Sequence, residues 1–187
     1  MTDKPTQSLR DFKVPPDFRG RGLVTVQLWN LVQRTLIALS PRPLHRWRCF
    51  WLRVFGAEVG QRVHIRPSVR VTYPWKVKIG NDVWLGDRAE LYSLESITVG
   101  ENVCISQDAY ICTGSHDMSR TDFAYKCNPV EIEAGSWIAA GAFVGPGVTV
   151  GSGAVLAARS VAMRALEPRM VYAGNPARAL RERTPVR

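Results

Sequence analysis

The sequence predicts a mainly β fold: a left-handed parallel β-helix with N-terminal helices and a C-terminal tail that is helical or irregular. Two observations lead to this prediction. An aliphatic residue recurs every six positions through the middle of the chain, and the residue after it is usually small. A six-residue step matches neither the period of a helix nor the alternation of a single strand. It is typical of a solenoid in which three short strands make one triangular coil.

The repeated positions are occupied only by Leu, Ile or Val. They are Val59, Ile65, Val71, Ile79, Leu85, Leu91, Val99, Ile105, Ile111, Ile132, Ile138, Val144, Val150 and Leu156. Small residues such as Gly60, Gly80 and Gly86 follow many of them, as a tight corner requires. A second small or β-branched residue usually comes four positions after each aliphatic residue and is expected to pack inside the prism.

The repeat has one large interruption, between Ile111 and Ile132. Residues 113–129 are too many for a corner and are rich in polar and turn-forming residues, so we expect a protruding loop there. The repeat divides the chain into an N-terminal helical cap or extension (1–58), the β-helix with its loop (59–162) and a C-terminal tail (163–187). A chain of 187 residues is a candidate for a single domain.

Two helices are expected before the repeat, over 23–39 and 44–55. The first is too short and too polar to span a bilayer. The second places Trp47, Phe50, Trp51 and Val54 on one face, and arginines elsewhere. Its main expected role is to cap the open end of the β-helix, which otherwise exposes unpaired backbone. Its aromatic and arginine content also suits peripheral contact with anionic lipid, on the inner face of a membrane.

Charge is distributed unevenly along the chain. The net charge is +6 over residues 1–58, −2 over 59–158 and +5 over 159–187. A nucleic-acid-binding protein more often carries a basic stripe on its folded face, and here the repeat is mildly acidic, so we discount nucleic acid. The four cysteines form no C-x-x-C pair and no signal peptide opens the chain. We therefore expect a reducing, cytoplasmic setting.

His116 is the candidate catalytic residue. The chain has three histidines, of which His45 falls in the basic helix and His64 in the first coil. His116 stands where the last regular strand enters the protruding loop, close to both a rigid wall and a movable segment. A neutral imidazole there can take a proton from a hydroxyl or an amine near neutral pH. Asp117 follows it directly, but neighbours in sequence need not face each other, and we assign no dyad.

Several stretches resemble the hexapeptide-repeat acyltransferases. They are Asn102 to Ser106, Cys112 to Asp117, Trp137 to Ala142 and Gly145 to Thr149. The closest resemblance is to the colanic acid biosynthesis acetyltransferase (WcaF) type, which is related to the nodulation, maltose and galactoside O-acetyltransferases. It is carried by Ile65 to Val69, Thr72 to Lys76 and Val171 to Arg178, and extends from about Phe18 to Arg183.

The resemblance implies a homotrimer that binds acetyl-CoA in a groove between neighbouring β-helices. His116 would act as general base on an acceptor hydroxyl, which attacks the thioester directly. Trp137, Ala140 and Ala158 fall where the family lines the pantetheine channel. Arg164, Arg178 and Arg181 match positions near the phosphates and adenosine of the cofactor. No metal is implied.

The chain departs from the family in two places. A Thr-Lys-Asp sequence common after the last coil is replaced by Met163, Arg164 and Ala165. On the acceptor side, members of the family carry an asparagine at the position of Gly86, which is next to Asp87 here. A closer relative carries an asparagine at the position of Ser93. Asp87, Ser93 and Asp117 are the candidate acceptor-binding residues.

The predicted function is O-acetylation of a sugar hydroxyl on a polysaccharide or glycan precursor. Alternatives within enzymes are N-acetylation of an amino sugar or acetylation of serine, whose enzymes usually carry larger N-terminal domains than residues 1–58 can supply. A γ-class carbonic anhydrase needs three histidines on the coils, and only His64 and His116 lie there. A non-catalytic β-helix scaffold is the remaining alternative.

Overall fold

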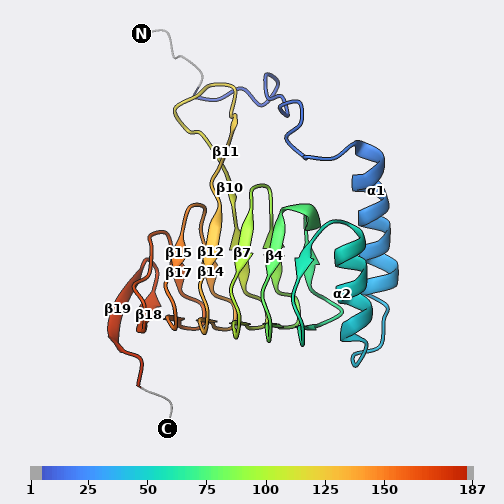
Figure 1. Cartoon of the computed structure of the whole chain (residues 1–187). Helices are drawn as coiled ribbons and strands as arrows, with labels where there is room; N and C mark the ends of the chain where they lie inside the picture. The colour runs from blue at the N-terminus through green and yellow to red at the C-terminus, as the bar shows by residue number, and fades with distance from the viewer. Residues whose placement is uncertain (1–5, 185–187) are drawn as a thin grey trace, which may run out of the picture.

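The computed structural model describes residues 6–184 as a parallel β-helix with two helices packed at its N-terminal end and a β-hairpin closing the other end (Figure 1). Three sheets form the sides of the prism. The first contains β1 (Glu58–Val59), β4 (Val77–Ile79), β7 (Ile97–Val99), β12 (Val130–Ile132) and β15 (Thr149–Val150). The third contains β3 (Arg70–Val71), β6 (Glu90–Tyr92), β9 (Tyr110–Cys112), β14 (Phe143–Val144) and β17 (Val161–Ala162).

The second sheet is the longest and carries the C-terminal hairpin. It contains β2 (His64–Ile65), β5 (Trp84–Leu85), β8 (Cys104–Ile105), β13 (Trp137–Ile138), β16 (Val155–Leu156), β18 (Met170–Gly174) and β19 (Ala177–Glu182). Corresponding strands of successive coils pair in parallel, so His64, Trp84, Cys104 and Trp137 stand in one row across this sheet. The fold predicted from the six-residue repeat is confirmed.

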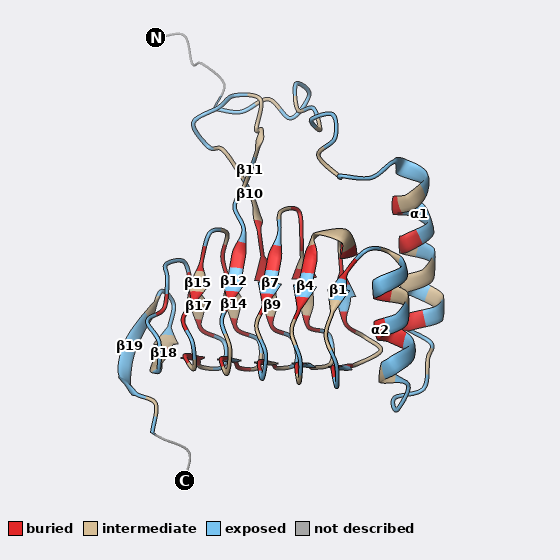
Figure 2. Ribbon diagram, in the orientation of Figure 1, coloured by how far each residue is buried: buried red, intermediate tan, exposed pale blue. Residues whose placement is uncertain are grey.

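The aliphatic positions of the repeat form the core. All of them except Val59 are buried, and Val59 packs against the core from the first coil. Figure 2 shows buried residues recurring along the coils. Burial of one stacked column of branched side chains per sheet leaves the outer row of each strand free to make a functional surface.

The large interruption of the repeat is a two-stranded antiparallel hairpin. It consists of β10 (Gly114–His116) and β11 (Tyr125–Cys127) and rises away from the solenoid (Figure 1). It leaves the prism between β9 of the third sheet and β12 of the first sheet. The residues predicted to protrude therefore do so at the corner where these two sheets meet.

The helices α1 (Leu23–Val32) and α2 (His45–Val54) cover the first coil, and a π-helical segment (Gln33–Ile37) continues α1. The side of α2 that faces the coils carries Arg48, Cys49 and Leu52, and Cys49 and Leu52 belong to the core. From α1, the Trp29 indole N–H donates to the Val71 carbonyl at 2.8 Å. Backbone at the open end of the solenoid is thus covered.

A short 3-10 turn (Pro74–Lys76) fills the longer corner between β3 and β4. The register slip expected between Val71 and Ile79 falls on this corner. No helix within residues 6–184 has both the length and the apolar character needed to cross a bilayer.

The tail differs from the helical or irregular segment that we expected. Residues of β18 pair in parallel with β16, and β19 folds back antiparallel onto β18. The last coil leaves an unpaired strand edge, and a parallel strand satisfies its backbone groups better than a helix can. The sequence signal was weak because the Gly174-Asn175-Pro176 turn separates one short strand from a second strand that carries Arg178, Arg181 and Glu182.

Candidate active site

His116 is the last residue of β10, and a backbone carbonyl of the same hairpin fixes its ring. Its Nδ1 lies 2.6 Å from the carbonyl oxygen of Phe123. A carbonyl oxygen can only accept, so the neutral ring carries its proton on Nδ1 and leaves Nε2 as a proton acceptor. The ring stacks on Phe123 with a centroid distance of 4.0 Å, and on Tyr125 at 4.9 Å.

The N-terminal segment supports this arrangement from outside the hairpin. Phe12 meets the His116 ring edge-on at 5.7 Å, and Phe18 stacks on Tyr125 at 4.4 Å. The backbone N–H of Ser8 donates to the Thr121 carbonyl at 2.6 Å. These contacts were missed from the sequence, because two single aromatic residues in a polar segment give no periodic signal of a contact a hundred positions away.

Asp117 does not orient His116. Its carboxylate accepts from the backbone N–H and the hydroxyl of Ser119, at 2.9 and 2.6 Å. These hydrogen bonds lower the pKa of Asp117. The carboxylate stabilises the turn at the tip of the hairpin, and the Phe123 carbonyl provides the orientation of the imidazole instead.

Ser93 is fully buried, which differs from its expected role at the acceptor. Its hydroxyl accepts from the backbone N–H of Tyr73 at 2.8 Å and donates to the Tyr73 carbonyl at 3.0 Å. The two hydrogen bonds join the long corners of successive coils. Ser93 therefore has a structural role and is left out of the acceptor site.

Trp137, Ala140 and Ala158 lie on two neighbouring coils, Trp137 in β13 and the alanines at the corners after β13 and β16. Trp137 projects outward, 44% exposed, and its indole N–H donates to the Ser106 hydroxyl at 2.9 Å. Ala140 lies at the corner after β13, and its carbonyl accepts from the Arg159 N–H at 2.9 Å. The corners that hold Ala140 and Ala158 are consequently stacked, and both side chains are small enough to leave room beside them.

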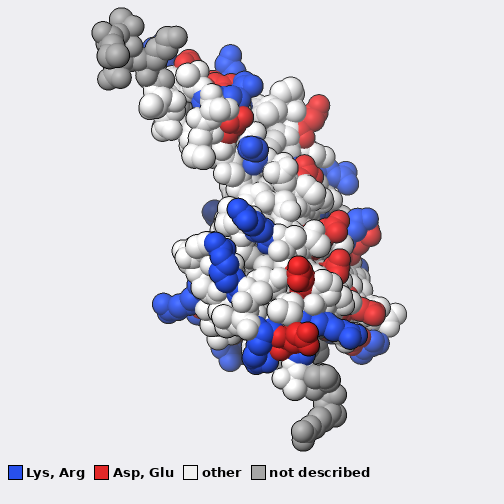
Figure 3. Space-filling view, turned by 90° about the vertical axis from the view of Figure 1, so that its left-hand side faces the viewer, with Lys and Arg blue, Asp and Glu red and all other residues white. Residues whose placement is uncertain are grey.

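The three candidate phosphate-binding arginines gather at the C-terminal end. Arg164 and Arg178 line one pocket of about 500 Å³. Arg178 and Arg181 pair with Ala173 and Val171, which are two residues apart on β18. A bulge in β19 thus puts both arginines on one face of the hairpin. Figure 3 looks onto this end of the molecule and shows basic side chains spread across it.

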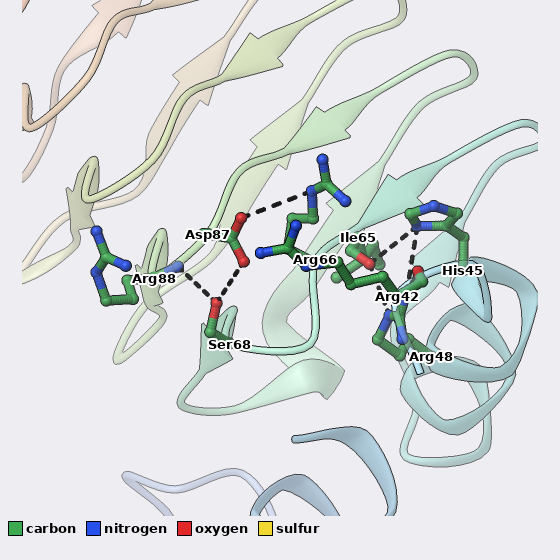
Figure 4. Close-up of polar contacts among 8 residues, drawn as sticks. All are labelled: Arg42, His45, Arg48, Ile65, Arg66, Ser68, Asp87 and Arg88. Atoms are coloured by element: carbon green, nitrogen blue, oxygen red, sulfur yellow. Dashed lines mark hydrogen bonds and ion pairs between the residues drawn. The ribbon is translucent and has the colours of Figure 1, made fainter. Parts of the chain in front are cut away.

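Asp87 lines a second pocket of about 500 Å³, on the outer face of the second sheet. Its carboxylate accepts from the Ser68 hydroxyl at 3.0 Å and lies 3.7 Å from the Arg66 guanidinium (Figure 4). His45, His64 and Trp84 line the same pocket. The sequence did not indicate that α2 would bring His45 to this sheet.

The structure does not bring Asp87 and His116 together in one subunit. Asp87 lies at the corner that precedes β6, and His116 follows the other end of β9 in the same sheet. The two residues therefore occupy different corners of the prism.

The thiols of Cys112 and Cys127, which lie near His116 in the sequence, are not activated as nucleophiles. Burial raises the pKa of the thiols of Cys112 and Cys127, and all four cysteines are free. Among the described residues, no three His, Cys, Asp or Glu side chains gather as metal ligands. The rings of His45 and His64 are tilted, with centroids 4.6 Å apart, whereas His116 lies against Phe12, Phe123 and Tyr125.

Comparison with known proteins places these features in a family, although no family model matches the chain. The chain is 49% identical over 177 residues to the protein named as colanic acid biosynthesis acetyltransferase WcaF in Escherichia coli (strain K12), which spans 95% of this chain and 97% of that protein.

Solved structures show the same fold. A hexapeptide-repeat acetyltransferase of Vibrio cholerae O1 biovar eltor, complexed with acetyl coenzyme A, matches with a TM-score of 0.78 at 23% identity, over 87% of this chain and 88% of that one. A galactoside acetyltransferase in complex with coenzyme A matches with a TM-score of 0.79 at 20% identity, over 94% and 89% of the two chains. The chain is an acyltransferase and belongs to the hexapeptide-repeat acetyltransferases of the colanic acid biosynthesis (WcaF) type.

Proposed function

We propose that the protein is an acetyl-CoA-dependent O-acetyltransferase that acts on a sugar hydroxyl of a polysaccharide or glycan precursor. The observation that carries the proposal is the hydrogen bond from His116 Nδ1 to the Phe123 carbonyl. It leaves Nε2 free to accept a proton, on a hairpin that projects from a rigid solenoid. The relative named for colanic acid biosynthesis supports a glycan acceptor.

His116 would act as general base in a direct transfer. Its Nε2 takes the proton from the acceptor hydroxyl as the oxygen attacks the thioester carbonyl carbon. When the carbon–sulfur bond breaks, the imidazolium returns this proton to the thiolate, and the products are the acetyl ester and CoA thiol. The raised pKa of the nearby Cys112 thiol argues against an acyl-enzyme on that residue.

Acetyl-CoA would lie along the outer edge of the second sheet. Arg164, Arg178 and Arg181 are exposed at the C-terminal end and suit phosphate groups as donors of several hydrogen bonds. Trp137 and the stacked alanine corners would border the pantetheine arm. The complexes of acetyl coenzyme A and coenzyme A with proteins of this fold support the assignment.

A homotrimer would complete the site. His116 and the pocket around Asp87 lie at different corners of one prism, so a neighbouring subunit can bring its hairpin to the pocket. A groove between subunits would hold both substrates together, as direct transfer requires.

The proposal is tested by measuring CoA thiol release from acetyl-CoA with a panel of acceptors. The panel contains simple glycosides, lipid-linked oligosaccharides, amino sugars and serine, and NMR of the product locates the acetyl group. We expect release with a glycoside and an ester on its hydroxyl. An amide product would instead support the N-acetyltransferase alternative. Absence of both release and CoA binding would support a scaffold.

We further propose that the N-terminal helices contact a membrane surface. Large apolar side chains are exposed on α1, on α2 and between them: Leu23, Val24, Leu28, Leu31, Leu36, Leu39, Leu44, Trp47, Phe50 and Val54. Figure 2 shows exposed residues along both helices. Residues 18–57 contain seven arginines and no carboxylate. This combination suits an interface with anionic lipid, and a lipid-linked acceptor would be presented there.

Flotation with lipid vesicles tests the membrane contact. We expect the protein to float with vesicles that contain phosphatidylglycerol and to remain behind with phosphatidylcholine alone. Replacing Leu28 and Phe50 with Ser should abolish flotation, whereas Leu180→Ser, at the opposite end of the solenoid and 66% exposed, should not. Equal flotation of the wild type and the Leu28/Phe50 variant would overturn this proposal. If the protein without lipid has a mass above that of a trimer, the exposed apolar side chains would instead mediate self-association.

A further inference from the structure

The pocket around Asp87 adjoins Trp137, where we place the pantetheine arm of acetyl-CoA. Trp137, two coils away from Trp84 on the second sheet, donates its indole N–H to the Ser106 hydroxyl at 2.9 Å. Ser106 and Cys104 line the pocket on the side of Trp137. The pocket therefore opens on the same sheet face as the candidate pantetheine channel, farther from the arginines at the C-terminal end.

Aromatic rings form one wall of this pocket. The ring of His64 lies between those of His45, at a centroid distance of 4.6 Å, and Trp84, at 5.5 Å. The indole of Trp84 is 60% exposed, although tryptophan is generally among the residues that bury most surface. An exposed indole that is supported from behind by other rings offers an apolar face for a sugar ring.

Arg66 lies between Asp87 and His45 in this pocket (Figure 4). The Arg66 guanidinium lies 3.7 Å from Asp87, which is longer than a hydrogen bond, and the other carboxylate oxygen accepts from Ser68 (Figure 4). Arg88 differs, because its Nε and Nη2 donate to the two carboxylate oxygens of Asp108, at 2.6 and 2.7 Å. Arg66 is thus held near Asp87 while its guanidinium N–H groups remain available, and His45 and His64 lie in the same pocket.

We propose that this pocket binds the acceptor glycan and selects one that carries an anionic group. Trp84 supports the sugar ring, Asp87 accepts from its hydroxyls, and Arg66 with His64 binds a phosphate or a carboxylate on the same glycan. The inference rests on the proposed function and names its substrate class: a glycosyl phosphate or a uronate, rather than a neutral glycoside.

Three matched glycosides test the selection: methyl glucoside, methyl glucuronide and glucosyl phosphate. In CoA release, kcat/KM should be about 10- to 100-fold higher for at least one anionic glycoside than for methyl glucoside, mainly through KM. Preference for glucosyl phosphate would identify a phosphate next to the sugar, and preference for the glucuronide a uronate. Equal kcat/KM for all three would overturn the inference.

Arg66→Gln is the decisive variant, and Arg62→Gln is its control. Arg62 is also exposed and paired with an aspartate, Asp82 at 2.6 Å, but it does not line the pocket. Arg66→Gln should reduce the preference for the anionic glycoside to nearly none, and Arg62→Gln should retain it. If both variants keep the same preference as the wild type, Arg66 does not bind the anion and the inference fails.

A binding measurement separates this inference from the proposed function. Ligand-detected NMR of the three glycosides, with CoA present, reports pocket occupancy whether or not acetyl transfer occurs. Selective binding of an anionic glycoside without any CoA release would support the pocket and contradict the proposed reaction. Release with neutral and anionic glycosides alike, and unselective binding, would support the reaction and contradict the pocket.

Discussion

Arg48 is a charged residue that is buried inside the N-terminal cap. Its side chain is fully buried, and it donates to the Ile65 carbonyl at 2.6 Å, the Pro41 carbonyl at 2.9 Å and the Ser40 hydroxyl at 2.7 Å. It also donates to the Arg42 carbonyl. The guanidinium therefore joins the loop before α2 to the first coil of the β-helix.

Replacing Arg48 with Ala should lower the free energy of unfolding by about 2–4 kcal/mol, because the buried Ile65 carbonyl and three partly buried acceptors lose their donor. Arg46→Ala, on the exposed side of the same helix, should change it by no more than about 0.5 kcal/mol. Urea denaturation followed by circular dichroism measures both. Similar midpoints for the two variants would show that the buried hydrogen bonds do not stabilise the cap.

His45 should make stability depend on pH. Burial lowers the pKa of His45 from 6.5. The hydrogen bond to the Ile65 carbonyl acts in the opposite direction, and the charges of Arg48, His64 and Arg66 add to the lowering. The unfolded chain then binds a proton more readily than the folded one, so the contribution of His45 is present above about pH 6.5 and is lost as pH falls through 6.5 toward the lower folded value.

Thermal unfolding at several pH values checks this prediction. The decrease in Tm between pH 7.5 and 5.5 should be smaller in His45→Gln than in the wild type, since glutamine does not titrate. An identical pH dependence in both proteins would mean that His45 titrates alike in the folded and unfolded chains.

At the scale of the element, the corners of the coils explain why small residues follow the aliphatic positions. A Cβ atom added to Gly86 would lie 2.5 Å from the backbone nitrogen of Gln107 and 2.7 Å from the carbonyl carbon of Ser106. The coils stack too closely there for any side chain. This contact also gives a physical reason why the chain has no asparagine at this position.

Gly86→Ala should therefore destabilise the protein by about 1–3 kcal/mol, since the next coil must move. Gly22→Ala is the control, because a Cβ there meets nothing within 4 Å. Differential scanning fluorimetry should show a lower Tm for Gly86→Ala and little change for Gly22→Ala. Equal Tm values would indicate that the corner accommodates a methyl group without strain.

The elements that could be predicted from the sequence are those with a period. The repeat fixed the register of the coils, and its interruption located the hairpin that carries His116. The Phe12 and Phe18 contacts, the exposed side of α2 and the C-terminal hairpin could not be predicted. Each depends on contacts between segments that are distant in the sequence. An isolated aromatic residue or a charged strand has no sequence pattern that identifies the segment it contacts.

At the scale of the whole molecule, the separation of His116 from the Asp87 pocket leads to a prediction about assembly. Sedimentation equilibrium should give a mass about three times the 20.9 kDa of one chain. In the described residues, exposed side chains lie on the outer faces of all three sheets, and a neighbouring β-helix would bury some of them. A monomer at the protein concentration of the activity assay, with full activity, would contradict a site shared between subunits.

The site itself was only partly predictable from the sequence. His116 could be singled out because it stands at a break in a regular pattern. Phe123 could not be predicted as the residue that orients His116, because the acceptor is a backbone carbonyl in the connection before β11. Ser93 was selected by position alone, and its burial shows that alignment within a coil does not determine whether a side chain faces the acceptor.

Turnover of His116→Ala tests the central claim most directly. With acetyl-CoA and an acceptor that the wild type uses, kcat should fall by about two to four orders of magnitude, while the Kd for CoA stays within about threefold. Met118→Ala, 90% exposed on the same hairpin, should retain wild-type kcat. If His116→Ala keeps a kcat close to that of the wild type, His116 is not the base, and the mechanism proposed for this acetyltransferase is wrong.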